Sequence, residues 1–303
     1  MQQTPLLLPT PALMKLKGKQ VLIKRKYPNV ATKIKGITQQ VVLNGDTQMN
    51  IINYNFYATL LDSYQNYLDS DILYEKYYGG SDKYLITIDE FEAEQKQSLI
   101  DRINRIPFEN DAALRGSAYN EIVDCLIEHR NTDKMKISKV FNANNMVIAL
   151  KAEYKEREFV FPIEMCKDMA DLFKSAIPQY YCEAVLPTKY GNVKLYGYID
   201  ELMPNSIHDI KTTSSYSAYK FRNHWQHKVY PYCLQQMGSD VSKFEYDIVV
   251  MGKDTSKYDF FTEVYNFNPA EDIARLTAHC ESLIEFLNAN KDSITDKKIF
   301  NHE

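Results

Sequence analysis

The sequence predicts a mixed α/β fold in which a central β-sheet is flanked by helices. The first observation behind this prediction is the order of patterns after residue 110, where helical and strand-like spacings of apolar residues alternate several times. The second is the composition of the 303-residue chain, which is 45% hydrophobic and 25% charged, with 10 glycines and 11 prolines. This is ordinary globular usage, so it excludes a disordered, collagenous or disulfide-framework protein.

A basic N-terminal extension, residues 1–50, is expected to precede a folded domain of residues 51–303. Eight lysine and arginine residues and no acidic residue occur in the first 45 positions, although the whole chain carries a net charge of −4. Two interpretations stay open. The segment is either a solvated, β-rich extension, or an arm whose Lys24, Arg25 and Lys26 contact DNA phosphates.

In the first half of the domain, three helices and a hairpin are expected. Apolar residues three and four positions apart predict helices over residues 54–68, 90–103 and 115–128. Alternation of polar and apolar residues predicts two or three antiparallel strands within residues 135–161.

The second half of the domain is expected to alternate helices with strands. The expected helices are residues 163–175, 217–237 and 269–290. The expected strands are residues 180–186, 193–202, 206–211, 244–251 and 260–267. Gly191 with Asn192, and Pro204 with Asn205, supply the turns that separate the first three strands.

The apolar runs and the cysteines exclude several kinds of protein. No run of 18 apolar residues occurs, so no transmembrane helix is expected, and prolines interrupt the leucine-rich start, so no secretory signal is expected. The five cysteines are scattered without a Cys-x-x-Cys pair, which predicts buried thiols in a reducing cytoplasm. Neither zinc nor an iron–sulfur cluster is expected.

The residues that could carry chemistry lie on two neighbouring strands. Asp209 and Lys211 are two positions apart, so both side chains leave the same face of their strand. Asp200 lies near the end of the preceding strand, and the intervening turn would bring it beside Asp209. A strand-borne pair of opposite charges is often only a surface ion pair that contributes little to stability.

The second carboxylate favours a catalytic interpretation. Two carboxylates held together repel one another unless a cation lies between them. Hard oxygen ligands with few other protein donors suit Mg²⁺, for which Mn²⁺ can substitute. A nearby lysine can then orient the attacking water or stabilise charge on a phosphoryl oxygen. These residues therefore predict metal-assisted hydrolysis of a phosphodiester.

Four motifs resemble those of the PD-(D/E)XK nuclease superfamily, and within it the RecB-like and exonuclease VIII-like branch. Residues 197–200 (Gly-Tyr-Ile-Asp) are followed by residues 207–213 (Ile-His-Asp-Ile-Lys-Thr-Thr). Residues 226–230 match the Gln-x-x-x-Tyr helix of that branch, and residues 116–121 match in spacing its Gly-x-x-x-His-Glu helix. The motifs occur in the order and at the gaps that are typical of the branch.

This resemblance implies a restriction-endonuclease-like core over about residues 110–290, with a mixed central β-sheet flanked by helices. It implies that Asp200, Asp209 and the backbone carbonyl of Ile210 bind Mg²⁺.

The resemblance also implies roles beyond the metal ligands. Lys211 would position the nucleophilic water, and Gln226 with Tyr230 would hold the lysine or the DNA strand. Without the preceding motif, the same two residues would be typical of helix-surface packing. Thr212 and Thr213 could bind DNA phosphates or simply cap the next helix.

The helix motif departs from the family pattern at one position. Asn120 stands where many relatives have a metal-binding histidine, and an amide oxygen is a poorer ligand than imidazole. Glu121 is the next residue along the helix, and we expect it to supply the third acidic group of the site. Glu128, two turns on, is the alternative.

Three histidines are further candidate ligands. His224 and His227 are three residues apart, but without cysteines at metal spacing they are typical of an ordinary helix surface. His208 should point to the strand face opposite Asp209 and pack there.

The resemblance implies a Mg²⁺-dependent deoxyribonuclease, most simply an exonuclease of DNA recombination, repair or phage DNA processing. The alternatives are a structure- or site-specific endonuclease, and a DNA-binding protein that keeps a catalytically degenerate form of the fold, which Asn120 favours. A single-strand annealing or other recombination protein is the expected kind of partner. Cleavage polarity, strand preference and the oligomeric state, including a homo-oligomer, stay open.

Overall fold

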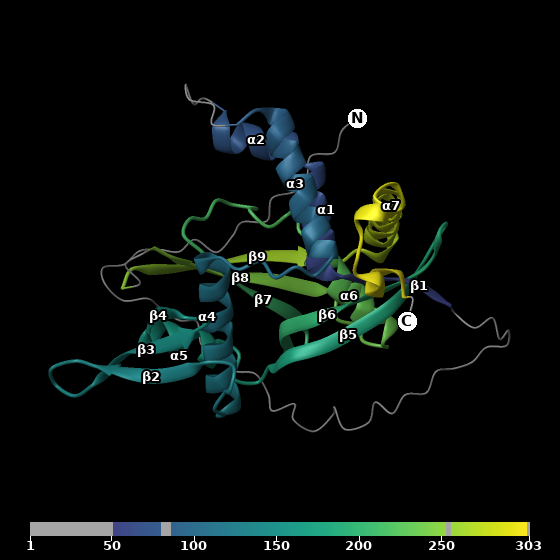
Figure 1. The fold of residues 1–303 in the computed structure, drawn as a ribbon. Coiled ribbons are helices and arrows are strands. Elements are labelled where there is room, and N and C mark those ends of the chain that lie inside the picture. The colour runs from purple at the N-terminus through teal and green to yellow at the C-terminus, as the bar shows by residue number, and fades with distance from the viewer. Residues whose placement is uncertain (1–50, 80–85, 253–255, 302–303) are drawn as a thin grey trace, which may run out of the picture. The chain divides into compact units, whose positions relative to one another are not determined.

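A mixed six-stranded β-sheet and a separate three-stranded sheet organise the protein, which we describe from a computed structural model (Figure 1). The structure describes residues 51–79, 86–252 and 256–301. They belong to the second of two compact units of the chain, which begins at Thr47. The expected mixed α/β class with a central sheet flanked by helices is confirmed.

The basic N-terminal segment lies outside the described residues. The expected contacts of Lys24, Arg25 and Lys26 with DNA therefore stay predictions.

The central strand of the larger sheet is β6 (Gly191–Met203). One edge of β6 pairs antiparallel along its length with β5 (Ile177–Thr188). Its other edge is shared, because β1 (Ile52–Tyr57) pairs parallel with the first part and β7 (Ser206–Thr213) pairs antiparallel through only three residue pairs at the end. Residues 197–200 of β6 therefore have no strand partner on this edge within the described chain. We call this unpaired stretch the β6 gap.

The sheet continues beyond β7 with β8 (Lys243–Met251), which is parallel to β7, and β9 (Tyr258–Asn266), which is antiparallel to β8. The three-stranded sheet is the expected stretch of alternating residues. It consists of β2 (Lys136–Phe141), β3 (Val147–Tyr154) and β4 (Arg157–Pro162).

Each face of the six-stranded sheet is covered by its own set of helices (Figure 1). Helices α1 (Ala58–Leu68), α6 (Gln226–Gln236) and α7 (Pro269–Ala289) pack on one face, and α3 (Ile88–Ile103) packs on α1. Helix α4 (Asp111–Glu128) packs on the other face against β7, together with α5 (Ile163–Leu172) and the three-stranded sheet. The residues of the four sequence motifs lie on α4, β6, β7 and α6, around the β6 gap.

Two helices begin later than the sequence predicts. Residues 54–57 continue the apolar spacing of α1, but they pair with β6 as part of β1, so the helix starts at Ala58. The helix expected from residue 217 starts at Gln226 instead, because side chains of α1 bind the preceding turn (see below). Helix α2 (Ser70–Tyr78), which lies between α1 and α3, was not predicted.

The cysteines and the helices bear on two expectations from the sequence. All five cysteines are free and buried, as the sequence predicted. Among the described residues, no helix combines the length and the apolar character that crossing a membrane requires. Two short 3₁₀ turns, η1 (Lys291–Ser293) and η2 (Lys297–Phe300), follow α7.

Candidate active site

Asp209 and Lys211 project from β7 toward α6, on the same side as the buried Ile207. Lys211 Nζ lies 2.7 Å from Asp209 Oδ2. Asp209 is only 2% exposed, so this is a largely buried ion pair rather than the weak surface pair that is common on strands.

Asp200 lies in the β6 gap and bridges it with its side chain. Continuing the β6–β7 register would place Ile210 opposite Ile199, but the strands separate before that point. The backbone N–H of Ile210 donates instead to Asp200 Oδ2 at 3.0 Å. Asn120 on α4 donates from Nδ2 to the same oxygen at 3.1 Å. The carboxylate thus takes up a backbone donor that the separated strands leave unpaired.

The alternation of side chains along β6 shifts by one residue at Asp200 and Glu201. Ile199 and Leu202 are three residues apart, yet both pack into the same core, which a regular strand would not allow. Consecutive acids can therefore both approach α4. Burial raises the pKa of Glu201 and of Asp124 on α4, which lie next to one another.

Gln226, the first residue of α6, contacts both charged residues of β7. Its Nε2 donates to Asp209 Oδ1 at 2.5 Å, and its Oε1 accepts from Lys211 Nζ at 2.8 Å. This placement is the one that the resemblance implies for the glutamine.

Two glycines of the motifs are explained by close packing. A Cβ atom at Gly197 would lie 2.6 Å from Cε1 of Tyr230, which α6 presses onto β6. A Cβ atom at Gly116 would lie 3.0 Å from Oγ1 of Thr212, where α4 crosses β7. Only glycine permits the first of these approaches without a shift. Tyr230 is 3% exposed, so its ring is a buried wall of the site rather than a free surface group.

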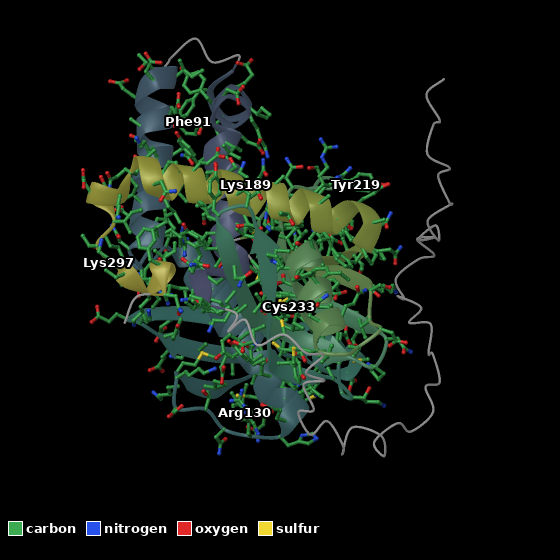
Figure 2. All side chains as sticks on the ribbon, turned by 90° about the vertical axis from the view of Figure 1, so that its right-hand side faces the viewer. Phe91, Arg130, Lys189, Tyr219, Cys233 and Lys297 are labelled. Carbon is green, nitrogen blue, oxygen red and sulfur yellow. The ribbon has the colours of Figure 1, made fainter. Side chains whose placement is uncertain are left out.

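Glu121 does not join this cluster, contrary to the expectation that it turns toward Asp200. His129 ends α4 in a left-handed conformation with φ of 52°, and the chain turns back so that Arg130, labelled in Figure 2, reaches Glu121. Arg130 Nη1 lies 2.6 Å from Glu121 Oε1, and Lys134 Nζ lies 2.5 Å from Oε2. The alternative, Glu128, also pairs with Arg130. These cations hold both glutamates away from the β6 gap.

The two threonines expected to contact DNA differ in their surroundings. Thr212 packs against α4 at Gly116. Thr213 Oγ1 donates to the carbonyl of Ser215 at 2.9 Å and accepts from Lys220 Nζ at 2.6 Å. Thr213 therefore orders the turn that follows β7.

The electrostatics of the cluster favour a bound cation. Burial and the neighbouring Asp209 raise the pKa of Asp200 above its usual range. Burial opposes the charge of Lys211, but Asp209 and Asp200 outweigh burial and raise the pKa of Lys211. The Oδ1 atom of Asn120 is buried and has no hydrogen-bond partner in the described chain. Two carboxylates and an unpartnered amide oxygen are a donor set that suits Mg²⁺ or Mn²⁺.

Asp62 on α1 is a site residue that the sequence analysis missed. Its Oδ1 accepts from the backbone N–H of Trp225 at 2.5 Å, directly before Gln226. Burial raises the pKa of Asp62 to about 7, although the Trp225 N–H and Lys211 oppose this. The available signal was an acid placed between Leu61 and Tyr64, on the apolar side of a predicted helix.

Two further side chains bind the same turn, one from α1 and one from Asp69, which caps the C-terminus of α1. Gln65 Oε1 accepts from the Trp225 indole at 3.2 Å, and Asp69 Oδ2 accepts from Asn223 at 3.3 Å. Asp62 and Gln65 lie on one face of α1, and Asp69 at its C-cap continues this spacing of three and four residues. We call these three residues the α1 clamp, and it fixes the point at which α6 begins.

A second group of metal-ligating type lies on the opposite face of β7. His208, Glu245 and Asp247 place their ligand atoms within 4.8 Å of one another. His208 faces away from Asp209, as predicted, and its ring nitrogens contact Ser206 Oγ at 2.7 Å and Asp247 Oδ2 at 2.8 Å. Both nitrogens of His208 therefore have hydrogen-bond partners, and Glu245 pairs with Lys243, so these side chains are satisfied by protein groups.

Comparisons with known proteins add little to this geometry. No protein-family model matches the chain, and no curated protein matches it. A solved structure titled "Crystal structure of SSO0001" is similar over 80% of each chain, with 12% sequence identity and a TM-score of 0.38.

Proposed function

We propose that this protein is a metal-dependent deoxyribonuclease that hydrolyses phosphodiester bonds, acting as an exonuclease in DNA recombination, repair or phage DNA processing. The observation that carries the proposal is the convergence of Asp200, Asp209, Lys211 and Gln226 at the β6 gap. Helix α6 and two strands that separate at this point contribute these four side chains.

The residues of the cluster divide into metal ligands and a positioned cation. Asp200, Asp209 and the Oδ1 atom of Asn120 would hold Mg²⁺ or Mn²⁺. When bound, the metal would polarise the phosphoryl group and make a water acidic enough to act as nucleophile. Lys211 is held by Gln226 and Asp209, so its ammonium is oriented before substrate arrives. It would orient the attacking water or stabilise the charge that develops on a phosphoryl oxygen.

One experiment tests the proposal. The purified protein is incubated with end-labelled linear DNA and with closed circular DNA, each with Mg²⁺, with Mn²⁺ or with a chelator. We expect linear DNA to be degraded only when a metal is present. The Lys211→Ala variant is the matched control for a contaminating nuclease, and we expect it to be inactive.

The arms of this experiment separate the alternatives. Cleavage of closed circular DNA would support an endonuclease rather than an exonuclease. DNA binding without cleavage in either metal would support a catalytically degenerate DNA-binding protein and overturn the proposal. Equal cleavage by the wild type and the Lys211→Ala variant would also overturn it.

A further inference from the structure

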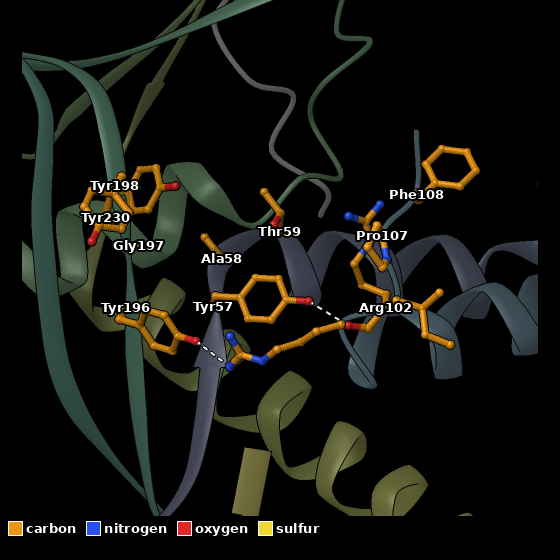
Figure 3. Close-up of a pocket in the computed structure, with 12 residues that line it drawn as sticks. Tyr57, Ala58, Thr59, Arg102, Pro107, Phe108, Tyr196, Gly197, Tyr198 and Tyr230 are labelled. Atoms are coloured by element: carbon orange, nitrogen blue, oxygen red, sulfur yellow. Dashed lines mark hydrogen bonds between the residues drawn. The ribbon is translucent and has the colours of Figure 1, made fainter. Parts of the chain in front are cut away.

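A pocket of about 500 Å³ lies at the first two residues of the β6 gap, Gly197 and Tyr198 (Figure 3). Gly197 and Tyr198 of β6 form part of its wall, and so does Tyr230, which lies one turn beyond Gln226. The pocket therefore lies beside the candidate site, because Gly197 and Tyr198 closely precede Asp200 on the same strand. Its volume is typical of a pocket for one small ligand group, roughly 300–1,000 Å³.

Aromatic rings dominate the walls of this pocket. They belong to Tyr57, Phe108, Tyr196, Tyr198 and Tyr230. Figure 3 shows Tyr198 and Tyr230 on one side, and Pro107 and Phe108 on the other. Tyr198 is 58% exposed, so its ring is accessible to a ligand. Phe108 is also exposed, at 62%. Exposed aromatic rings in a pocket suit a flat, unsaturated ring such as a nucleobase.

Two arginines of the pocket differ in what they contact. Arg105 pairs with Asp296 at 2.8 Å and donates to the Tyr196 hydroxyl at 3.1 Å, so it holds the pocket wall in place. The guanidinium of Arg102 forms no ion pair with any described residue, although its backbone carbonyl accepts from the Tyr57 hydroxyl at 2.9 Å. Within the part of the chain that the structure describes, Arg102 is thus a cation without an acidic partner, beside a set of aromatic rings.

We infer that this pocket binds one unstacked nucleotide of the DNA strand, with its base against Tyr198 and the neighbouring rings and its phosphate beside Arg102. The inference rests on the proposed function, because DNA held for cleavage at Asp200 and Asp209 passes the pocket. A base paired within a duplex cannot enter such a pocket without leaving its stack. Single-stranded or frayed DNA is therefore the substrate class of this site.

The test measures DNA binding without cleavage. All proteins carry Lys211→Ala and are kept in chelator. The probes are a short fluorescein-labelled DNA strand and the blunt duplex of the same sequence, and fluorescence anisotropy gives their dissociation constants. The pocket variants are Tyr198→Ala and Arg102→Gln. The matched controls are Tyr77→Ala, a similarly exposed tyrosine outside the pocket, and Arg275→Gln, an exposed arginine on α7.

We expect Tyr198→Ala to weaken single-strand binding by about tenfold, which is the size of the loss when one base–aromatic stack is removed. Arg102→Gln should weaken it too, and should lower the magnitude of the salt dependence of log affinity by about 0.7, as for one lost phosphate contact on a single strand. Duplex binding and both control variants should change little. Thermal melts should show that each variant is folded, since both pocket residues are exposed.

Unchanged single-strand affinity in both pocket variants would overturn the inference, and so would an equal loss in the control variants. The proposed function is judged separately, by metal-dependent cleavage with Lys211 intact. If the protein cleaves DNA but the pocket variants bind single strands normally, the pocket inference is wrong and the proposed nuclease function stands. If the protein does not cleave DNA but the pocket variants lose single-strand binding, the pocket binds DNA and the proposed nuclease function is wrong.

Discussion

Gln226 donates a hydrogen bond from Nε2 to Asp209 Oδ1 at 2.5 Å. Its carbonyl oxygen accepts from Lys211, so one uncharged side chain satisfies an anion and a cation that already contact one another. A charged residue at this position would repel one of its two partners. The arrangement therefore depends on an amide, which offers a donor and an acceptor at once.

We predict that Gln226→Ala destabilises the protein by about 1–3 kcal/mol, because a buried carboxylate oxygen of Asp209 loses its donor. Urea denaturation of the wild type and the variant measures this difference. Gln236→Ala, at the exposed last residue of the same helix, is the control and should change stability by less than about 0.5 kcal/mol. Equal stability of Gln226→Ala and wild type would contradict the arrangement described above.

Removal of the candidate catalytic cation is the second test. We predict that Lys211→Ala lowers the rate of DNA cleavage by about a hundredfold or more while the protein remains folded, because a preoriented charge is lost. Turnover at saturating Mg²⁺ and a thermal melt check the two halves of the prediction. Lys167→Ala, at an exposed position of α5, should leave the rate unchanged. A rate for Lys211→Ala above about a tenth of wild type would exclude a role of this size.

The two neighbours on α4 should separate metal binding from stability. We predict that Asn120→Ala weakens Mn²⁺ binding, because its unpartnered Oδ1 lies at the site, whereas Glu121→Gln does not. Glu121→Gln should instead lower the melting temperature, since Arg130 and Lys134 lose their shared carboxylate. Calorimetric titration compares the Mn²⁺ affinities of the two variants, and thermal melts compare their melting temperatures. A larger loss of metal affinity in Glu121→Gln than in Asn120→Ala would show that Glu121, and not Asn120, binds the metal.

The α1 clamp predicts a positioning role for Asp62. Asp62→Ala removes the acceptor of the Trp225 N–H and should lower kcat more than it raises KM, because Gln226 would no longer be held against Lys211. Asp62→Asn keeps an acceptor oxygen of the same shape and should restore most of the rate. Steady-state kinetics of the two variants distinguish positioning from folding. An equal loss of kcat in Asp62→Ala and Asp62→Asn would show that the charge of Asp62, rather than its hydrogen bond, supports the rate.

A buried histidine predicts the pH dependence of stability. His279 stacks on Trp225 with ring centroids 3.9 Å apart, and burial lowers the pKa of His279 to about 4. The unfolded chain takes up this proton near the ordinary value of about 6.5, so its contribution to stability is complete above pH 6.5 and is lost as the pH falls toward 4. The expected slope is about 1.4 kcal/mol per pH unit within that window.

The variant His279→Gln cannot bind this proton. Its stability, measured by urea denaturation from pH 8 to pH 4, should therefore fall less steeply than that of the wild type. Asp62 titrates in the opposite sense, because its raised pKa favours the folded state as the pH falls below about 7, but it is common to both proteins. Parallel curves for the two proteins would contradict the prediction.

The sequence was informative where the structure is local. The turn at Pro204 and Asn205 joins adjacent strands, so periodicity and turn residues were enough to bring Asp200 near Asp209. The spacing of Gln226 and Tyr230 was likewise enough to place both on one face of α6.

Contacts between distant segments were not available from the sequence. Residues 54–57 carry the spacing of a helix but become a strand, because β6 offers them an edge. The α1 clamp delays α6 to Gln226 in the same way. The choice between Asn120 and Glu121 depends on Arg130, which reaches back only because His129 adopts a left-handed conformation. Adjacent positions on a helix cannot be separated by pattern alone.

The short pairing of β6 with β7 makes the protein divisible at the turn between them. A chain cut between Pro204 and Asn205 would leave Asp200 on the first fragment, and Asp209, Lys211 and Gln226 on the second. Neither fragment would carry both carboxylates, so the proposed hydrolysis would require the two to associate. The wide burial of α6 and α7 against β5 and β6 would drive that association. The same architecture could therefore serve as a split reporter, in which DNA cleavage records the meeting of two fused proteins.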